Sequence, residues 1–324
     1  MGPREDAKEM PVSTRMKPAP GRNDAALRRV IAFINGKGGV LKTTLTANVG
    51  GLLAASGYRV LIADLDPQGN LAEDLGYTGT DVDDEGKNLA QALAFGEPLT
   101  PVQAVRENLD VLPGGTHLEL ATAALTSKAA KDPVGAKLAL ATALEPIADQ
   151  YDMILLDCPP GDETLQTAAT AAARWLLIPV KSDASSRKGI TAVMNRLNAV
   201  LGDNSELDLL GVVLTAVGTS ATTVQKQARL AIAEAFGGSE DVVFDKTVRH
   251  SEATAQATRE RGMLVHELDT VIQNGPKWYE VIRGDAQAQD LAPRSSTSVA
   301  DDLLGVAQEL VSRITAAENE EAAS

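Results

Sequence analysis

Short, continuously apolar segments alternate with longer amphipathic segments along most of the chain. Each apolar segment lacks the polar alternation of a half-exposed strand and is typical of a strand covered on both faces. The predicted strands are 29–35, 59–64, 109–112, 153–157, 175–180, 208–215 and 242–244. The predicted helices are 42–56, 88–95, 134–149, 185–201 and 221–236. This alternation predicts an α/β fold, a doubly wound and mostly parallel sheet flanked by helices in a single domain.

The pattern weakens at both ends of the chain and once near its C-terminus. Residues 1–27 are rich in proline, charge and small polar side chains, so we expect a disordered N-terminal arm. The ordered domain is expected at 28–269, followed by a loop-rich insertion at 270–296. A single apolar stripe then predicts a C-terminal helix at 297–317 that packs on the domain, before a frayed acidic tail at 318–324.

Composition narrows the class of protein. Apolar residues make up 44% of the chain and aromatic residues only 3%, so the core must be aliphatic. The net charge of −14 argues against a surface coated in nucleic acid, although it permits a local basic patch. A single cysteine, Cys158, excludes a disulfide framework and fits a reducing cytoplasm. No apolar run approaches the ~20 residues needed to cross a bilayer, so we expect no membrane partner.

The clearest chemistry lies in the glycine- and lysine-rich segment that follows the first strand. Lys42 and Thr43 stand as in the P-loop pattern, in which the lysine reaches the β- and γ-phosphates and the hydroxyl holds Mg²⁺. Backbone N–H groups and the positive end of the next helix would hold the phosphates. A plain glycine-rich turn with surface lysines is the less favoured alternative. The predicted nucleotide-binding residues are Gly36, Lys37, Gly38, Gly39, Val40, Leu41, Lys42, Thr43 and Thr44.

Leu41 is the one departure from the general motif, because it stands where the second glycine belongs. Glycine permits backbone angles and close approaches that leucine resists. We therefore expect nucleotide binding to be kept, while the rate of hydrolysis and the geometry of the loop are open.

Carboxylates follow two further predicted strands, at the edge of the sheet where ligands bind in open parallel folds. Asp64 and Asp66 belong to the segment Asp-Leu-Asp-Pro-Gln-Gly-Asn, which alone would be an ordinary acidic turn. Asp157 follows four apolar residues, as does the aspartate that supports Mg²⁺ in many P-loop proteins, although Pro159 to Asp162 also form a helix-capping turn. Thr43 and Asp157 are the predicted metal residues, with Asp66 as a further one acting through water.

These three segments, taken in order, resemble the ParA/MinD family of deviant Walker-A ATPases. The resemblance covers about residues 28–268 and is nearest to the ParA-type (Soj-like) partition ATPases. It implies an ATP-sandwiched homodimer in which Lys37 reaches the partner's phosphates, Asp66 positions the attacking water and Lys42 acts on the phosphates. The final helix is acidic at Asp301, Asp302 and Glu309, unlike the basic membrane helix of MinD-like proteins.

Partition ATPases bind DNA without sequence preference, which requires a modest basic surface. The low aromatic content argues against base stacking, so contact would be to phosphate. The predicted DNA-binding residues are Arg187, Lys188, Lys226, Arg229 and Arg249, and further basic candidates in the same half of the chain are Arg196, Arg259 and Arg261. Each of these side chains taken alone is more typical of an ordinary solvated charge.

The resemblance implies a cytoplasmic, nucleoid-associated ATPase that hydrolyses ATP slowly to ADP and phosphate with Mg²⁺. ATP would close the dimer on DNA, and a ParB-like centromere-binding partner would stimulate hydrolysis and release the DNA. Two alternatives stay open. One is a ParA-like positioning scaffold for a non-DNA cargo, and the other is an ATP-binding protein whose hydrolysis is impaired by Leu41.

Overall fold

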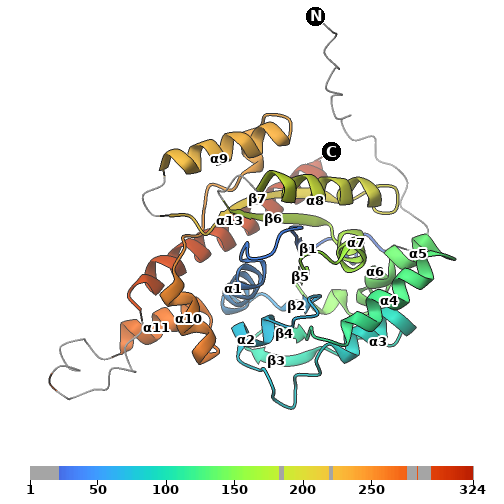
Figure 1. Cartoon of the computed structure of the whole chain (residues 1–324), viewed down its shortest axis with the longest axis horizontal. Helices are drawn as coiled ribbons and strands as arrows, with labels where there is room; N and C mark the ends of the chain where they lie inside the picture. Colours follow the sequence, from blue (N-terminus) through green and yellow to red (C-terminus); the bar gives the residue numbers. More distant parts are fainter. Residues whose placement is uncertain (1–21, 182–185, 219–221, 276–282, 284–292, 324) are drawn as a thin grey trace, which may run out of the picture.

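A central twisted sheet organises the computed structural model, which describes residues 22–181, 186–218, 222–275, 283 and 293–323 (Figure 1). The strands of the sheet lie in the order β3-β4-β2-β5-β1-β6-β7. All neighbouring pairs are parallel except β3 and β4, which are antiparallel. The strands are β1 Val30–Phe33, β2 Val60–Asp64, β3 Val102–Arg106, β4 Leu109–Leu112, β5 Met153–Asp157, β6 Trp175–Lys181 and β7 Asp208–Thr215. The predicted fold class is confirmed.

Helices cover both faces of this sheet. Their bounds are α1 Lys42–Ala55, α2 Leu71–Leu75, α3 Lys87–Phe95, α4 Leu118–Ala129, α5 Pro133–Lys137, α6 Ala139–Leu144, α7 Glu163–Ala172, α8 Ser186–Val200, α9 Thr222–Ala235, α10 Glu252–Arg261, α11 Val265–Asn274 and α13 Ser295–Ala323. Two short 3₁₀ helices, η1 Ala148–Gln150 and η2 Glu240–Val242, complete the described elements. No helix in the described ranges is both long and apolar enough to cross a bilayer.

The two faces of the sheet bury separate aliphatic cores. One core joins the sheet to α3, α4, α6, α7 and α8, and the other joins it to α1, α2, α11 and α13. Figure 1 shows these two groups on opposite sides of the strands. Gly50 lets α1 sit directly on the sheet, since a Cβ there would lie 2.6 Å from Cδ1 of Ile62. The helix that follows the glycine-rich loop is therefore fixed by close packing.

Several predicted elements differ from those in the structure. The predicted strand 242–244 is instead η2 followed by a single bridge from Val243 to Val212. The predicted helix 134–149 is divided into α5, α6 and η1. The edge strand β3 was not predicted, because its side chains are partly exposed and no apolar run marks it.

Residues 22–27 and 318–323, which were expected in a disordered arm and a frayed tail, are ordered parts of the fold. Arg22 and Leu27, inside the expected arm, are both buried, and the Arg22 guanidinium donates to the carbonyl of Ala171 at 3.1 Å. Helix α13 runs on through most of the expected acidic tail, where Glu318 pairs with Arg29 at 2.7 Å. The predicted insertion overlaps the end of α11 and the start of α13, and most of its remainder, like residues 1–21, lies outside the described residues.

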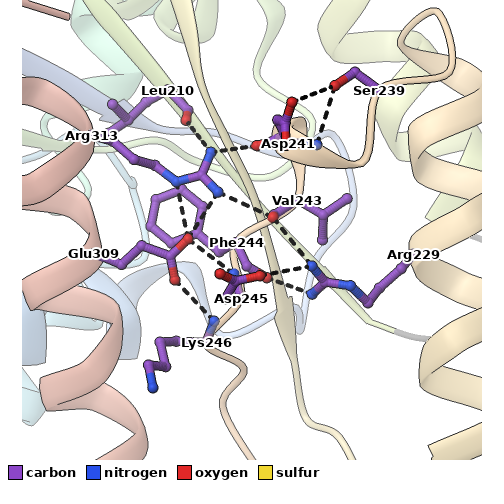
Figure 2. A network of polar contacts seen from close by, with 10 residues as sticks. All are labelled: Leu210, Arg229, Ser239, Asp241, Val243, Phe244, Asp245, Lys246, Glu309 and Arg313. Carbon is purple, nitrogen blue, oxygen red and sulfur yellow. Dashed lines mark hydrogen bonds and ion pairs between the residues drawn. The ribbon is translucent and has the colours of Figure 1, made fainter. Parts of the chain in front are cut away.

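An arginine on α13 fastens that helix to the end of the sheet (Figure 2). The Arg313 guanidinium donates to the carbonyls of Leu210, Asp241 and Val243 at 2.7–3.2 Å. It also stacks 4.2 Å from the ring centre of Phe244 and is held by Glu309 at 2.8 Å. Because η2 has no strand ladder, this network replaces the hydrogen bonds that the predicted strand would have made.

Candidate functional site

The glycine-rich loop connects β1 to α1 at the carboxyl end of the sheet. Asn35, the first residue after the apolar strand, donates to the carbonyl of Pro179 at 2.7 Å, and its side-chain oxygen accepts from the Lys37 N–H at 2.9 Å. Asn35 is not among the predicted site residues, although an asparagine directly after an apolar run and before a glycine-rich segment was a usable signal. Gly38 and Gly39 are exposed, so the mouth of the loop faces outward.

Lys42 is buried at the base of the loop with 6% exposure. Its ammonium donates to the carbonyl of Lys37 at 3.0 Å, which draws the loop around it. Burial lowers the pKa of Lys42, while the nearby Asp157 carboxyl opposes that shift. Anionic phosphate oxygens would compensate this buried positive charge.

Leu41 adopts the left-handed backbone conformation, with φ 63° and ψ 31°, directly before α1. Glycine reaches this region without strain, whereas a leucine Cβ crowds the following carbonyl. The loop therefore keeps the backbone path that a glycine would give. Leu41, the departure from the motif, therefore leaves the loop formed but strains its backbone at this position.

Asp64 and Asp157 lie directly opposite each other at the ends of β2 and β5. Both are fully buried, and one oxygen of each, Oδ2, is buried without a hydrogen-bond partner. Burial raises the pKa of Asp157 to about 7, against the hydroxyl of Thr43 and the charge of Lys42. Burial and the Asp157 charge also raise the pKa of Asp64 well above its usual range. Two unsatisfied carboxylate oxygens beside a threonine hydroxyl fit an oxygen-preferring divalent cation such as Mg²⁺.

Asp66 is held in the turn that follows β2. Its N–H donates to Asp64 at 2.9 Å, and its own Oδ1 accepts from the Gln68 N–H at 2.9 Å. Asp66 lines a cavity of about 230 Å³ together with Lys42, Thr43 and Thr44. The cavity thus brings together Lys42, Thr43, Thr44 and Asp66, while the predicted metal residue Asp157 lies behind it in contact with Thr43.

A second cavity, of about 210 Å³, adjoins the first and shares Leu41 and Thr44 with it. Its walls are more apolar and include residues at the end of β7 and from α10, α11 and α13. This cavity could not be predicted from the sequence, because its walls come from segments far apart along the chain. Together the two cavities form a site with one polar end and one apolar end, as a nucleotide requires.

The three predicted DNA-binding residues whose side chains the structure describes, Arg249, Arg229 and Lys226, do not form a single open cluster. Arg249 is bound by both carboxylate oxygens of Asp302, at 2.6 and 2.8 Å. Arg229 donates to the carbonyl of Phe244 at 2.6 Å (Figure 2). Lys226 is exposed on α9. The side chains of Arg187 and Lys188, near the start of α8, lie outside the described part of the chain.

Two basic candidates have other surroundings in the folded chain. Arg196 donates to the carbonyl of Glu163 at 2.8 Å, between α8 and α7. Arg259 lines both cavities of the site and lies 3.7 Å from Asp74 of α2. Neither placement was predicted, since position along the chain says nothing about which surface a helix presents.

The chain is similar in sequence to several known proteins. A family model described as an AAA domain matches residues 28–209. The chromosome partitioning protein ParA of Caulobacter vibrioides is 34% identical over 237 residues, which cover 69% of this chain and 83% of that protein.

Solved structures share the fold of this chain. McdA of Cyanothece, in complex with ATP, superposes with a TM-score of 0.67 at 21% identity and covers 87% of this chain and 96% of its own. Cobyrinic acid a,c-diamide synthase of Mycobacterium smegmatis, with a bound ATP analogue and magnesium, has a TM-score of 0.60 at 30% identity, with coverage of 72% and 92%.

Proposed function

The chain belongs to the ParA/MinD family of P-loop ATPases, and from that membership we propose that it is a DNA partition ATPase. It binds ATP with Mg²⁺ and hydrolyses it to ADP and phosphate. The observation that carries this proposal is the convergence of Lys42, Thr43 and Asp66 on one cavity at the carboxyl end of the sheet, with the buried Asp157 carboxyl hydrogen-bonded to Thr43 behind it. The site lies where open parallel sheets bind their ligands.

The phosphates occupy the polar cavity and the base the apolar one. Lys42, already desolvated, contributes its charge to the β- and γ-phosphates. Thr43 and Asp157 would hold Mg²⁺, which when bound neutralises charge on the phosphate oxygens, and Asp64 would support them from behind. The buried, unpartnered Oδ2 atoms of Asp64 and Asp157 support this assignment.

Asp66 is the residue that orients the attacking water. Its position at the edge of the cavity, with one carboxylate oxygen fixed by the Gln68 N–H, leaves the carboxylate rigid and close to the phosphates. A fixed acceptor lowers the entropy that the reaction must lose when water and phosphate are aligned. Hydrolysis is slow until a partner protein and DNA stimulate it.

Lys37 acts across a homodimer that forms only with ATP. The exposed glycines beside it let the loop of one protomer approach the nucleotide of the other. The γ-phosphate supplies contacts that exist in one nucleotide state only, so the dimer forms with ATP and separates after hydrolysis. This coupling lets a ParB-like partner release DNA by stimulating hydrolysis.

DNA contact is electrostatic and independent of sequence. Lys226, Arg187 and Lys188 are the basic candidates for it, whereas Arg249 and Arg229 are committed to contacts within the chain. We expect retention on nonspecific duplex DNA with ATP and not with ADP, falling steeply between about 50 and 200 mM salt. Lys226→Glu should weaken retention, and Lys128→Glu, also exposed but on α4, serves as the matched control.

A second candidate function is a positioning scaffold for a non-DNA cargo. The observation that favours it is the neutralisation of Arg249 by Asp302, which removes one basic residue from the proposed DNA surface. The DNA retention experiment separates the two functions. ATP-dependent dimers that show no DNA retention at about 50 mM salt would overturn the partition proposal in favour of the scaffold.

A further inference from the structure

An arginine from outside the three motifs lies at the junction of the two cavities. Arg259, near the end of α10, lines both the phosphate cavity and the apolar cavity. Thr44 and Leu41 are the other residues that the two linings share. A nucleotide that spans both cavities would pass this junction.

The charge around the phosphate cavity makes this arginine important. Asp66, Glu73 and Asp74 all line the cavity, and among the described residues of its lining only Lys42 and Arg259 are basic. A polyphosphate entering this cavity meets three carboxylates, which would repel it. Arg259 adds a positive charge to those of Lys42 and the proposed Mg²⁺, which shifts the local charge further in favour of an anionic ligand.

Asp74 holds Arg259 loosely. Its side chain is 8% exposed, whereas that of Arg259 is 57% exposed, and Nε lies 3.7 Å from Oδ1. The Asp74 carboxyl also accepts a hydrogen bond from the Thr44 hydroxyl, on the first turn of α1. The guanidinium therefore has N–H donors left for a ligand. The planar fork of these donors matches the geometry of phosphate oxygens.

The frame that positions this pair is rigid. α2 and α10 both end in left-handed glycines, Gly76 and Gly262, and a Cβ on Gly76 would lie 2.7 Å from the carbonyl oxygen of Gly262. Arg106 joins the same two ends, with donors to the carbonyls of Leu75 at 3.2 Å and Gly262 at 3.0 Å. The backbone of α10, which carries Arg259, is thus fixed relative to that of α2, which carries Asp74.

We propose that Arg259 is a nucleotide-binding residue, which α10 contributes to the phosphates at the junction of the two cavities, and that Asp74 is its positioning carboxylate. This inference rests on the proposed ATP site. It makes α10 part of the nucleotide site, so that nucleotide occupancy is felt in α10 and in α13, against which α10 packs.

The test measures ATP and ADP affinity by titration calorimetry with Mg²⁺. Arg259→Ala should weaken both affinities about tenfold, the effect of one charge-assisted hydrogen bond. The matched control is Arg59→Ala, because Arg59 has a side chain 56% exposed and an ion pair with Asp152, but stands just before β2 at the other end of the sheet. The control should bind both nucleotides as the wild type does.

A double variant separates direct contact from simple neutralisation of Asp74. If Arg259 contacts the nucleotide, Arg259→Ala combined with Asp74→Asn stays about as weak as Arg259→Ala alone. Recovery of wild-type affinity in the double variant would overturn the inference, as would an unchanged affinity in Arg259→Ala. A wild-type protein that binds no ATP would instead overturn the proposed function itself.

Discussion

Leu41 offers a direct test of the loop geometry, by comparison of Leu41→Gly with Leu41→Ala. Both variants remove the leucine side chain beyond Cβ, so they differ in Cβ alone. With φ at 63° and ψ at 31°, a Cβ at this position costs about 1–2 kcal/mol. Glycine lowers the free energy of unfolding by about 0.4–1 kcal/mol, because it gives the unfolded chain greater conformational freedom.

The glycine variant should therefore be more stable than the alanine variant by roughly 1 kcal/mol. The assay is urea unfolding at 25 °C, and for a chain of this size the same difference corresponds to about 2 °C in Tm. Ala123→Gly is the matched control, because Ala123 is exposed in the middle of α4. There glycine should be less stable than alanine by about 1 kcal/mol.

The sign of the difference decides the question. The opposite result would be that Leu41→Ala is more stable than Leu41→Gly by as much as the wild type is more stable than Ala123→Gly. In that case the backbone at position 41 is not left-handed, and the loop has another path. The rate of phosphate release by Leu41→Gly, compared with that of the wild type, then tests whether Leu41 affects hydrolysis. A large gain in rate over the wild type would indicate that the strained leucine restrains hydrolysis.

Three further predictions concern the dimer, pH and the C-terminal helix. Lys37→Ala should bind ATP but fail to dimerise with it, and an ATP-dependent dimer in light scattering would refute the role of Lys37. Burial and the Asp157 charge raise the pKa of Asp64 in the folded protein, so the folded protein loses stability as pH rises through that pKa. Asp64→Asn removes this charge and should raise Tm more at pH 8 than at pH 5. An equal gain in Tm at both pH values would contradict the assignment. Arg313→Ala should lower the free energy of unfolding by about 2 kcal/mol or more, since it leaves carbonyls unpaired and uncovers Phe244; a loss below about 0.5 kcal/mol in urea unfolding would mean that water replaces the arginine.

The sequence predicted the centre of this molecule better than its edges. The interior strands are buried on both faces, so their apolar runs stand out without knowledge of their neighbours. β3 is stabilised by pairing with β4 at the edge and has a mixed pattern that no local rule detects. Val243 lies in an apolar run too, yet its backbone is held by α13 through Arg313, which a local pattern cannot show.

The site divides in the same way. Lys42, Thr43, Asp66 and Asp157 belong to short motifs, and the parallel sheet brings the ends of β1, β2 and β5 together. The apolar cavity and Arg259 depend on α10, which is packed against α2 although the two are distant in sequence. Such contacts arise from tertiary packing, and no spacing in the chain indicates them.

The central claim is that the cavity around Lys42 binds and hydrolyses ATP. Steady-state phosphate release with ATP and Mg²⁺, measured with and without duplex DNA, tests it most directly when wild type, Lys42→Ala and Asp66→Ala are compared. We predict that the wild type releases phosphate slowly and that DNA increases the rate, whereas both variants release it at background. Of the two variants, only Asp66→Ala should still bind ATP. Wild-type release no greater than that of Asp66→Ala would contradict the claim.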